Sequence, residues 1–155
     1  MMPKVLILMG SKSDLPVAEK GISLLKKFGI DHEIHVASAH RTPKRVEDIV
    51  TKSDADVFIA IAGLSAALPG VVASLTTRPV IGVPVSGAVN LDALLSVTQM
   101  PPGIPVAAVG LDRGDNAAIL AAEIISVGTQ AMRKKLADYR KEMEQKVIAD
   151  SESVK

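Results

Sequence analysis

A histidine and an arginine stand side by side in "SAHRTP" (38–43), where an apolar run gives way to a polar, helix-like segment. Imidazole titrates near neutrality and can carry a proton, whereas the planar guanidinium of arginine suits a phosphate. A helix N-terminus adds unpaired N–H groups and a partial positive charge. His40 and Arg41 therefore predict an anion site with a proton carrier beside it. The alternative for His40 is a structural role, with its ring bonded to the backbone.

Serine and aspartate follow an earlier apolar run, in "GSKSD" (10–14). The hydroxyls of Ser11 and Ser13 suit a phosphate, and the carboxylate of Asp14 suits the hydroxyls of a ribose. The same residues would also make an ordinary helix cap. The segment matches neither the Walker pattern nor the dinucleotide pattern, so both interpretations stay open.

Two further loops carry small or rigid residues. In "AGLSAALPG" (62–70), small side chains would let backbone N–H groups face a ligand, although a close-packed turn explains them equally well. Consecutive prolines in "QMPPGIPV" (99–106) stiffen a loop that forms either a pocket wall or a plain connector. The absence of cysteine excludes disulfides, thiolate metal sites and a cysteine nucleophile, and no His/Asp/Glu cluster has metal-ligand spacing.

The elements that position these loops follow from the hydrophobic pattern. Continuous apolar runs at 5–10, 33–38, 57–63, 80–85 and 106–111 predict strands buried on both faces of a parallel sheet. Helix-like segments at 15–28, 43–52, 66–75 and 90–98 alternate with them. This alternation predicts a doubly wound α/β domain, in which the ligand crevice lies at the carboxyl ends of the strands. All five loops that follow strands are therefore expected at one edge of the sheet.

The last segment, 115–150, is apolar in its first half and charged in its second. It predicts one helix of about 30 residues with an irregularity at Gly128. We expect a single domain over 1–155, with a core at about 4–112 and a helical segment at about 115–148. Such a helix is longer than this domain can cover, which predicts a homo-oligomer; a monomer with a frayed tail is the alternative.

Composition narrows the classes of partner. The 18 basic and 17 acidic residues give a net charge of +1, which favours neither nucleic acid nor an anionic membrane. Aromatic residues make up 2% of the chain, too few for a stacked flavin or for base stacking. There is no run of about 18 apolar residues, and the first ten residues do not resemble a signal peptide, so we expect a cytoplasmic protein with a small-molecule substrate.

Taken together, the motifs "GSKSD", "SAHRTP", "LPG", "GVPV", "QMPPGIPV" and "NAAILAAEI" resemble the N5-carboxyaminoimidazole ribonucleotide mutase family of purine biosynthesis, over about residues 4–145. The resemblance implies a flavodoxin-like three-layer α/β/α sandwich with a five-stranded parallel sheet. It also implies a homo-octamer whose C-terminal helices pack on neighbouring subunits. No cofactor is implied, and a separate ATP-dependent enzyme would form the carbamate substrate.

The resemblance also implies roles for individual residues. Ser11, Asp14 and Arg41 would hold the ribose phosphate with Ser13 nearby, and His40 would move the proton at the imidazole carbon that accepts the carboxyl group. The implied reaction is decarboxylation of the N5-carbamate, capture of the CO2, attack by C4 and loss of the C4 proton. The remaining predicted substrate-binding residues are Ser38, Gly63, Ser65 and Leu68.

One position departs from the mutase pattern. Mutases usually carry a histidine directly before "LPG", where this chain has Ala67. A sister group, which carboxylates aminoimidazole ribonucleotide directly with CO2, resembles "GRSNALSG" there, and Ser65 and Ala67 agree with that pattern. Arg41, Pro43 and Pro69 agree with the mutase pattern. A mutase is the main prediction; a direct carboxylase and a non-catalytic nucleotide-binding module are the alternatives.

Overall fold

The computed structural model describes residues 3–154, which form a five-stranded sheet flanked by helices. All the strand pairs are parallel, and the strand order is β2-β1-β3-β4-β5. This is the predicted doubly wound fold. The elements in chain order are β1 (Lys4–Met9), the 3-10 turn η1 (Lys12–Asp14), α1 (Leu15–Phe28), β2 (Asp31–Val36), α2 (Pro43–Lys52), β3 (Val57–Ala62), α3 (Leu68–Ser74), β4 (Val80–Pro84), α4 (Asn90–Thr98), β5 (Ala107–Ala108), α5 (Gly114–Ser126) and α6 (Gln130–Ser153).

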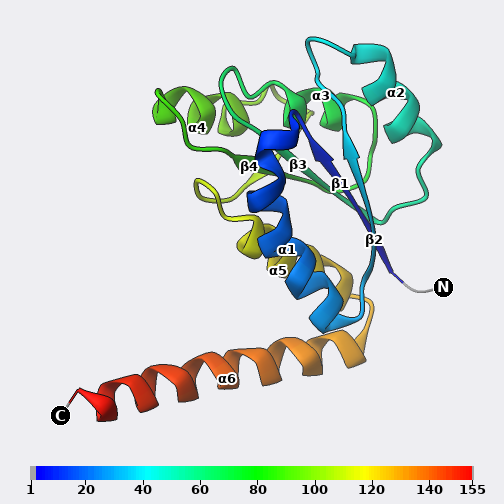
Figure 1. The fold of residues 1–155 in the computed structure, drawn as a ribbon. Helices are drawn as coiled ribbons and strands as arrows, with labels where there is room; N and C mark the ends of the chain where they lie inside the picture. Colours follow the sequence, from blue (N-terminus) through cyan, green and yellow to red (C-terminus); the bar gives the residue numbers. More distant parts are fainter. Residues whose placement is uncertain (1–2, 155) are drawn as a thin grey trace.

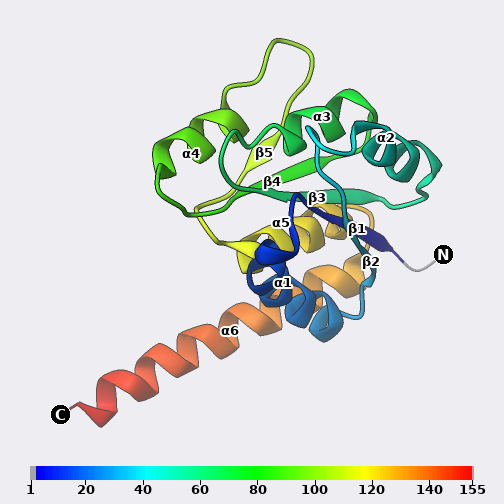
Figure 2. The same ribbon diagram turned by 45° about the horizontal axis from the view of Figure 1, so that its top comes forward.

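The helices form a layer on each face of the sheet (Figures 1 and 2). α1, α5 and the start of α6 pack on one face, and α2, α3 and α4 pack on the other. The strands β1, β3 and β4 run between these layers, and nearly all of their side chains are buried. Their continuous apolar sequences thus follow from cover on both faces.

The strands at the two edges of the sheet depart from the prediction. β2 is not buried on both faces: Ile34 and Val36 keep 39% and 43% of their surface exposed. The reason is that β2 pairs with β1 alone and the flanking helices leave it partly uncovered. At the other edge, β5 is limited to two residues, shorter than the expected 106–111.

α1 and α5 pack so closely that their backbones are in contact. A Cβ at Gly21 would lie 2.6 Å from the carbonyl oxygen of Gly114, and a Cβ at Gly114 would overlap the carbonyl oxygen of Val17. Only glycine permits this distance. The pair of glycines therefore fixes how α5 lies against α1 on the sheet.

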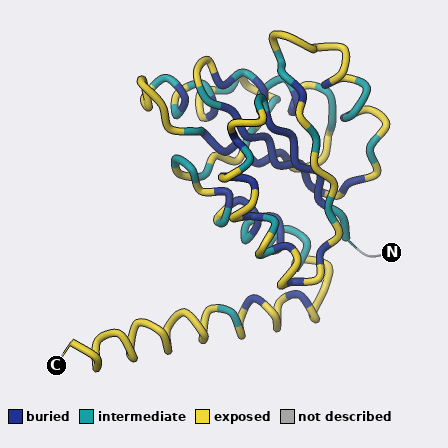
Figure 3. Tube along the Cα trace, viewed as in Figure 1, coloured by how far each residue is buried: buried dark blue, intermediate teal, exposed yellow. Residues whose placement is uncertain are grey.

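The predicted C-terminal helical segment is present, and the irregularity predicted at Gly128 divides it into two helices. α5 ends at Ser126 and α6 begins at Gln130, with Gly128 in the break between them. The last turn tightens, since the Gly128 N–H donates to the Ile125 carbonyl at 3.3 Å. α6 then leaves the body of the molecule and is exposed from Arg140 onward (Figure 3). Within residues 3–154 no helix is long and apolar enough to cross a membrane.

Candidate functional site

A cavity of about 390 Å3 opens where β1, β2 and β3 end. β1 lies between β2 and β3 in the sheet, so successive connections leave it on opposite sides. This is the switch point at which doubly wound folds bind ligands. All nine predicted site residues line the cavity: Ser11, Ser13, Asp14, Ser38, His40, Arg41, Gly63, Ser65 and Leu68.

Arg41 ties two of the cavity loops together. Its Nη2 donates to the carbonyl oxygen of Gly10 at 2.8 Å, and its Nε donates to Oγ of Ser38 at 3.2 Å. These bonds fix one side of the guanidinium. Nη1 makes no hydrogen bond within residues 3–154, so this edge of the cation is available to an anion.

The loop that carries His40 is closed by its own side chains. The Ser38 N–H donates to the Thr42 hydroxyl oxygen at 2.9 Å, and the Thr42 hydroxyl donates to the Ser38 carbonyl at 3.2 Å. Thr42 is the N-cap residue of α2, but its hydroxyl is used in this loop and does not cap the helix. His40 lies exposed at the tip, and its ring makes no hydrogen bond to another described residue. Among the described residues, the backbone bond that a structural role for His40 would need is thus not formed.

Asp14 is both a cap and a cavity residue. The Ser11 N–H donates to Asp14 Oδ2 at 3.0 Å, and the Ser13 N–H donates to Ser11 Oγ at 3.3 Å, which makes a capping box around η1. Only 6% of Asp14 is exposed. Burial raises the pKa of this carboxyl, against the opposing effects of the Ser11 N–H, the Ser13 hydroxyl and the charge of Arg41. The two interpretations of "GSKSD" are thus compatible.

Sequence reasoning missed several residues of the site. Gly10, Ala39 and Leu64 also line the cavity, and nothing but their place beside predicted residues marked them. Ala67, the position that departs from the mutase pattern, lines it as well. Asp92 does not line it, yet its carboxylate accepts the Ser65 N–H at 2.7 Å. An acidic residue in the first turn of a helix is so common that the sequence offers no signal for this contact.

The loops after β4 and β5 do not reach this cavity. They bind each other, because the carboxylate of Asp112 accepts the Ser86 N–H at 2.9 Å and also the Ser86 hydroxyl. The hydroxyl, and then the N–H, lower the pKa of Asp112. These two loops therefore follow their strands at the predicted edge of the sheet but do not line the cavity.

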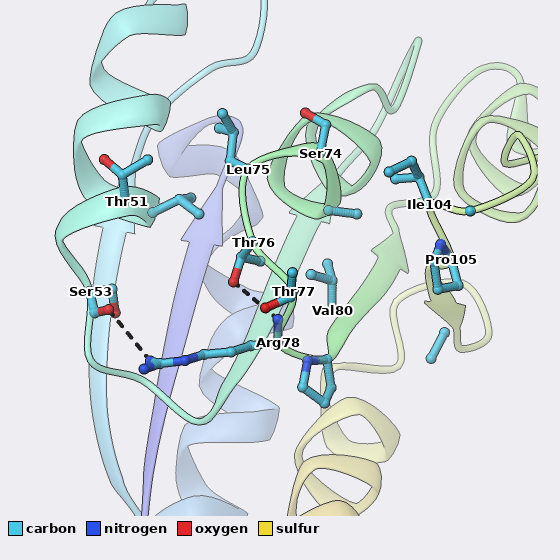
Figure 4. Close-up of a pocket in the computed structure, with 15 residues that line it drawn as sticks. Thr51, Ser53, Ser74, Leu75, Thr76, Thr77, Arg78, Val80, Ile104 and Pro105 are labelled. Carbon is cyan, nitrogen blue, oxygen red and sulfur yellow. Dashed lines mark hydrogen bonds between the residues drawn. The ribbon is translucent and has the colours of Figure 1, made fainter.

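A larger cavity, of about 990 Å3, lies near the C-terminal ends of α2 and α3 (Figure 4). Gly103, Ile104 and Pro105 of the proline-rich loop line this cavity and not the one at the switch point. Arg78 is the charged residue among its described lining, and its Nη1 donates to the backbone carbonyls of Ser53 and Ala55. Its guanidinium thus binds the backbone of the segment between α2 and β3.

The switch-point cavity carries the groups for binding an anion and moving a proton. Among residues 3–154 no group of three or more histidine or acidic side chains is placed to hold a metal ion. The strand order and the cavity together define a flavodoxin-like α/β protein with a cavity at its switch point.

Comparison with known proteins gives the family. The model of the AIR carboxylase family matches residues 4–146, and the chain belongs to that family. The N5-carboxyaminoimidazole ribonucleotide mutase of Methanocaldococcus jannaschii is 62% identical over 152 residues, 97% of each chain. A probable mutase of Methanobrevibacter smithii is 49% identical over 99% of this chain, which spans 47% of that longer protein. The crystal structure of Treponema denticola PurE superposes with a TM-score of 0.87 at 36% identity and covers 99% of both chains. The predicted family is confirmed.

Proposed function

We propose that this chain converts N5-carboxyaminoimidazole ribonucleotide into 4-carboxy-5-aminoimidazole ribonucleotide. The observation that carries the proposal is that Arg41, the serine hydroxyls and Asp14 line the same cavity as the exposed His40. Arg41 and the serines suit the phosphate, and the Asp14 carboxylate suits a ribose hydroxyl. The cavity volume, about 390 Å3, is in the range of small-molecule sites.

The reaction needs positioning and one mobile proton. The bond between N5 and the carboxyl carbon breaks, N5 takes up a proton, and CO2 stays in the cavity. C4 of the imidazole attacks the CO2, and the C4 proton then leaves. One proton is gained and one is lost, so a single group such as His40 can supply and recover it. The electron density comes from the aminoimidazole itself, and the enzyme holds the two fragments together.

The test is a side-by-side assay of His40→Asn and the parental protein, with the fresh N5-carbamate at low bicarbonate and with aminoimidazole ribonucleotide plus high bicarbonate. We expect efficient parental turnover of the carbamate. In His40→Asn, kcat should fall roughly a hundredfold or more, with little change in KM. A variant that turned over at the parental rate would remove His40 from the mechanism.

The same assay distinguishes the alternatives. Ser65 and Ala67, which agree with the direct carboxylases, both line the cavity. Turnover with aminoimidazole ribonucleotide and CO2 alone would establish direct carboxylation. Binding of the ribonucleotide without product from either mixture would establish a non-catalytic module.

We also propose a homo-oligomer, with the octamer implied by the resemblance as its size. Met132, Leu136, Tyr139, Met143 and Val147 recur at intervals of three or four residues and make one apolar stripe along α6. Met132 and Leu136 are buried against the chain's own core, whereas Met143 and Val147 are 43% and 67% exposed. A neighbouring copy would cover the exposed part. A cytoplasmic location and a separate ATP-dependent enzyme that supplies the carbamate belong to the same proposal.

A further inference from the structure

Ser65 holds an unusual backbone conformation in the third cavity loop. Its φ is +47°, in the left-handed region that residues with a Cβ seldom adopt. Such a conformation persists only where the surroundings enforce it. Ser65 also faces the cavity, together with Gly63, Ala67 and Leu68. Whatever holds Ser65 therefore sets the shape of this wall of the site.

The carboxylate of Asp92, in α4, binds the backbone of Ser65. The Ser65 N–H donates to Oδ2 of Asp92 at 2.7 Å, across 27 residues of sequence. Asp92 is half-buried in the first turn of α4 and does not line the cavity. A hydrogen bond to a carboxylate is short and strong, and it acts here on the residue with the strained backbone.

α4, the helix that carries Asp92, is packed firmly against the sheet. Ala93 and Val97 of α4 are buried against the sheet, where a Cβ on Gly82 would overlap Val97. The loop that leads into α4 is fixed as well, because Oδ1 of Asn90 accepts the Gly87 N–H at 2.9 Å. Asp92 thus projects from a packed helix toward the third loop.

We infer that Asp92 is a positioning residue, which orients the loop from Gly63 to Leu68 for the substrate through the N–H of Ser65. The inference rests on the proposed function for its catalytic consequence. The loop geometry itself can be measured without substrate.

Asp115 provides a matched control. It also lies in the first turn of a helix, α5, and it is also half-buried. Its carboxylate accepts the N–H of the adjacent Asn116 at 2.9 Å and pairs with Arg113 at 3.5 Å. It makes no hydrogen bond to a residue of the cavity. Asp115→Ala therefore removes a first-turn carboxylate and leaves the cavity loop bound.

The first measurement is hydrogen–deuterium exchange on the substrate-free protein. The peptide containing residues 63–68 should exchange several times faster in Asp92→Ala than in the parental protein. It should exchange at the parental rate in Asp115→Ala. Equal exchange in Asp92→Ala and the parental protein would overturn the inference, whatever the protein's activity.

The second measurement is steady-state kinetics with the N5-carbamate. Asp92→Ala should lower kcat/KM about tenfold, and Asp92→Asn should recover to within about threefold of the parental value, because an amide oxygen accepts the same N–H. Asp115→Ala should keep the parental kcat and KM. If Asp92→Asn were as defective as Asp92→Ala, or if Asp92→Ala matched Asp115→Ala, the positioning role would be wrong. An inactive parental protein would contradict the proposed function instead, and the exchange result would still decide the loop contact.

Discussion

At the scale of residues, the site is built from side chains that bind backbone groups of the loops around them. Asp14 accepts the N–H of Ser11, Arg41 donates to the carbonyl of Gly10, and Asp92 accepts the N–H of Ser65. Each contact fixes a short segment that local preference alone leaves free. The chemistry-bearing groups are thereby held before a ligand arrives.

Asp14 gives a prediction that separates stability from binding. Burial raises its folded-state pKa above the ordinary value of 3.8, so folding disfavours the ionised carboxylate. Below pH 3.8 the carboxyl is protonated in both states, and Asp14 makes its full contribution to the free energy of unfolding. This contribution is lost as the pH rises through the raised folded-state pKa. Asp14→Asn removes the ionisation but keeps an acceptor for the Ser11 N–H. At pH 7 the variant should be at least as stable as the parental protein, while kcat/KM falls about tenfold from the loss of a charged hydrogen bond to the substrate.

Thermal unfolding at several pH values checks the stability part. The advantage of Asp14→Asn should shrink as the pH falls through the raised folded-state pKa toward 3.8, and it should be absent below 3.8. A variant less stable than the parental protein by the same amount at every pH would show that Asp14 acts through packing and not through its charge. Kinetics on the same samples check the binding part.

At the scale of elements, close contact between the backbones of α1 and α5 fixes how these two helices pack on one face of the sheet. Strand and helix positions are largely predictable from the hydrophobic period, as the agreement for α1, α2 and α4 shows. The packing of α1 against α5 cannot be predicted in this way. Gly21 and Gly114 are far apart in sequence, and each could be an ordinary glycine of a loop or a helix. The sequence predicts an irregularity at Gly128 but not that α5 and α6 are separate helices.

We expect Gly114→Ala to destabilise the fold. The added Cβ would overlap the carbonyl oxygen of Val17, a backbone atom that cannot rotate away. Overpacking of this kind costs about 1–3 kcal/mol. Gly128→Ala is the matched control, since its Cβ would meet nothing within 4 Å. Urea unfolding should give a lower midpoint for Gly114→Ala and a midpoint close to the parental one for Gly128→Ala; equal midpoints would contradict the contact.

At the scale of the whole molecule, α6 reaches beyond the surface that one chain can cover. Tyr139 packs edge-on against Phe28, with ring centroids 5.5 Å apart, and Lys27 lies 4.9 Å from the Tyr139 ring. These contacts fix the first half of α6 to α1. The second half extends away, as Figure 1 shows, with Val147 and Ile148 exposed.

Charge placed on the exposed part of the stripe should reduce the assembly. Met143→Asp combined with Val147→Asp puts two carboxylates where we expect apolar contact with another copy. Gln145→Asp, on the opposite side of the helix, is the control. Light scattering after gel filtration should give several times 16.2 kDa for the parental protein and Gln145→Asp, and a smaller mass for the double variant. A parental mass of one chain at micromolar concentration would refute self-association.

The sequence by itself determined the alternation of strands and helices, the parallel sheet and the loops in which the nine predicted site residues lie. These properties depend on local pattern, because periodicity and turn residues record which faces are buried and where strands end. The tertiary structure alone decided that three loops and not five enclose the cavity, that β2 is an exposed edge and that Asp92 holds Ser65. These depend on contacts between distant segments, whose geometry is fixed only when the helices pack on the sheet.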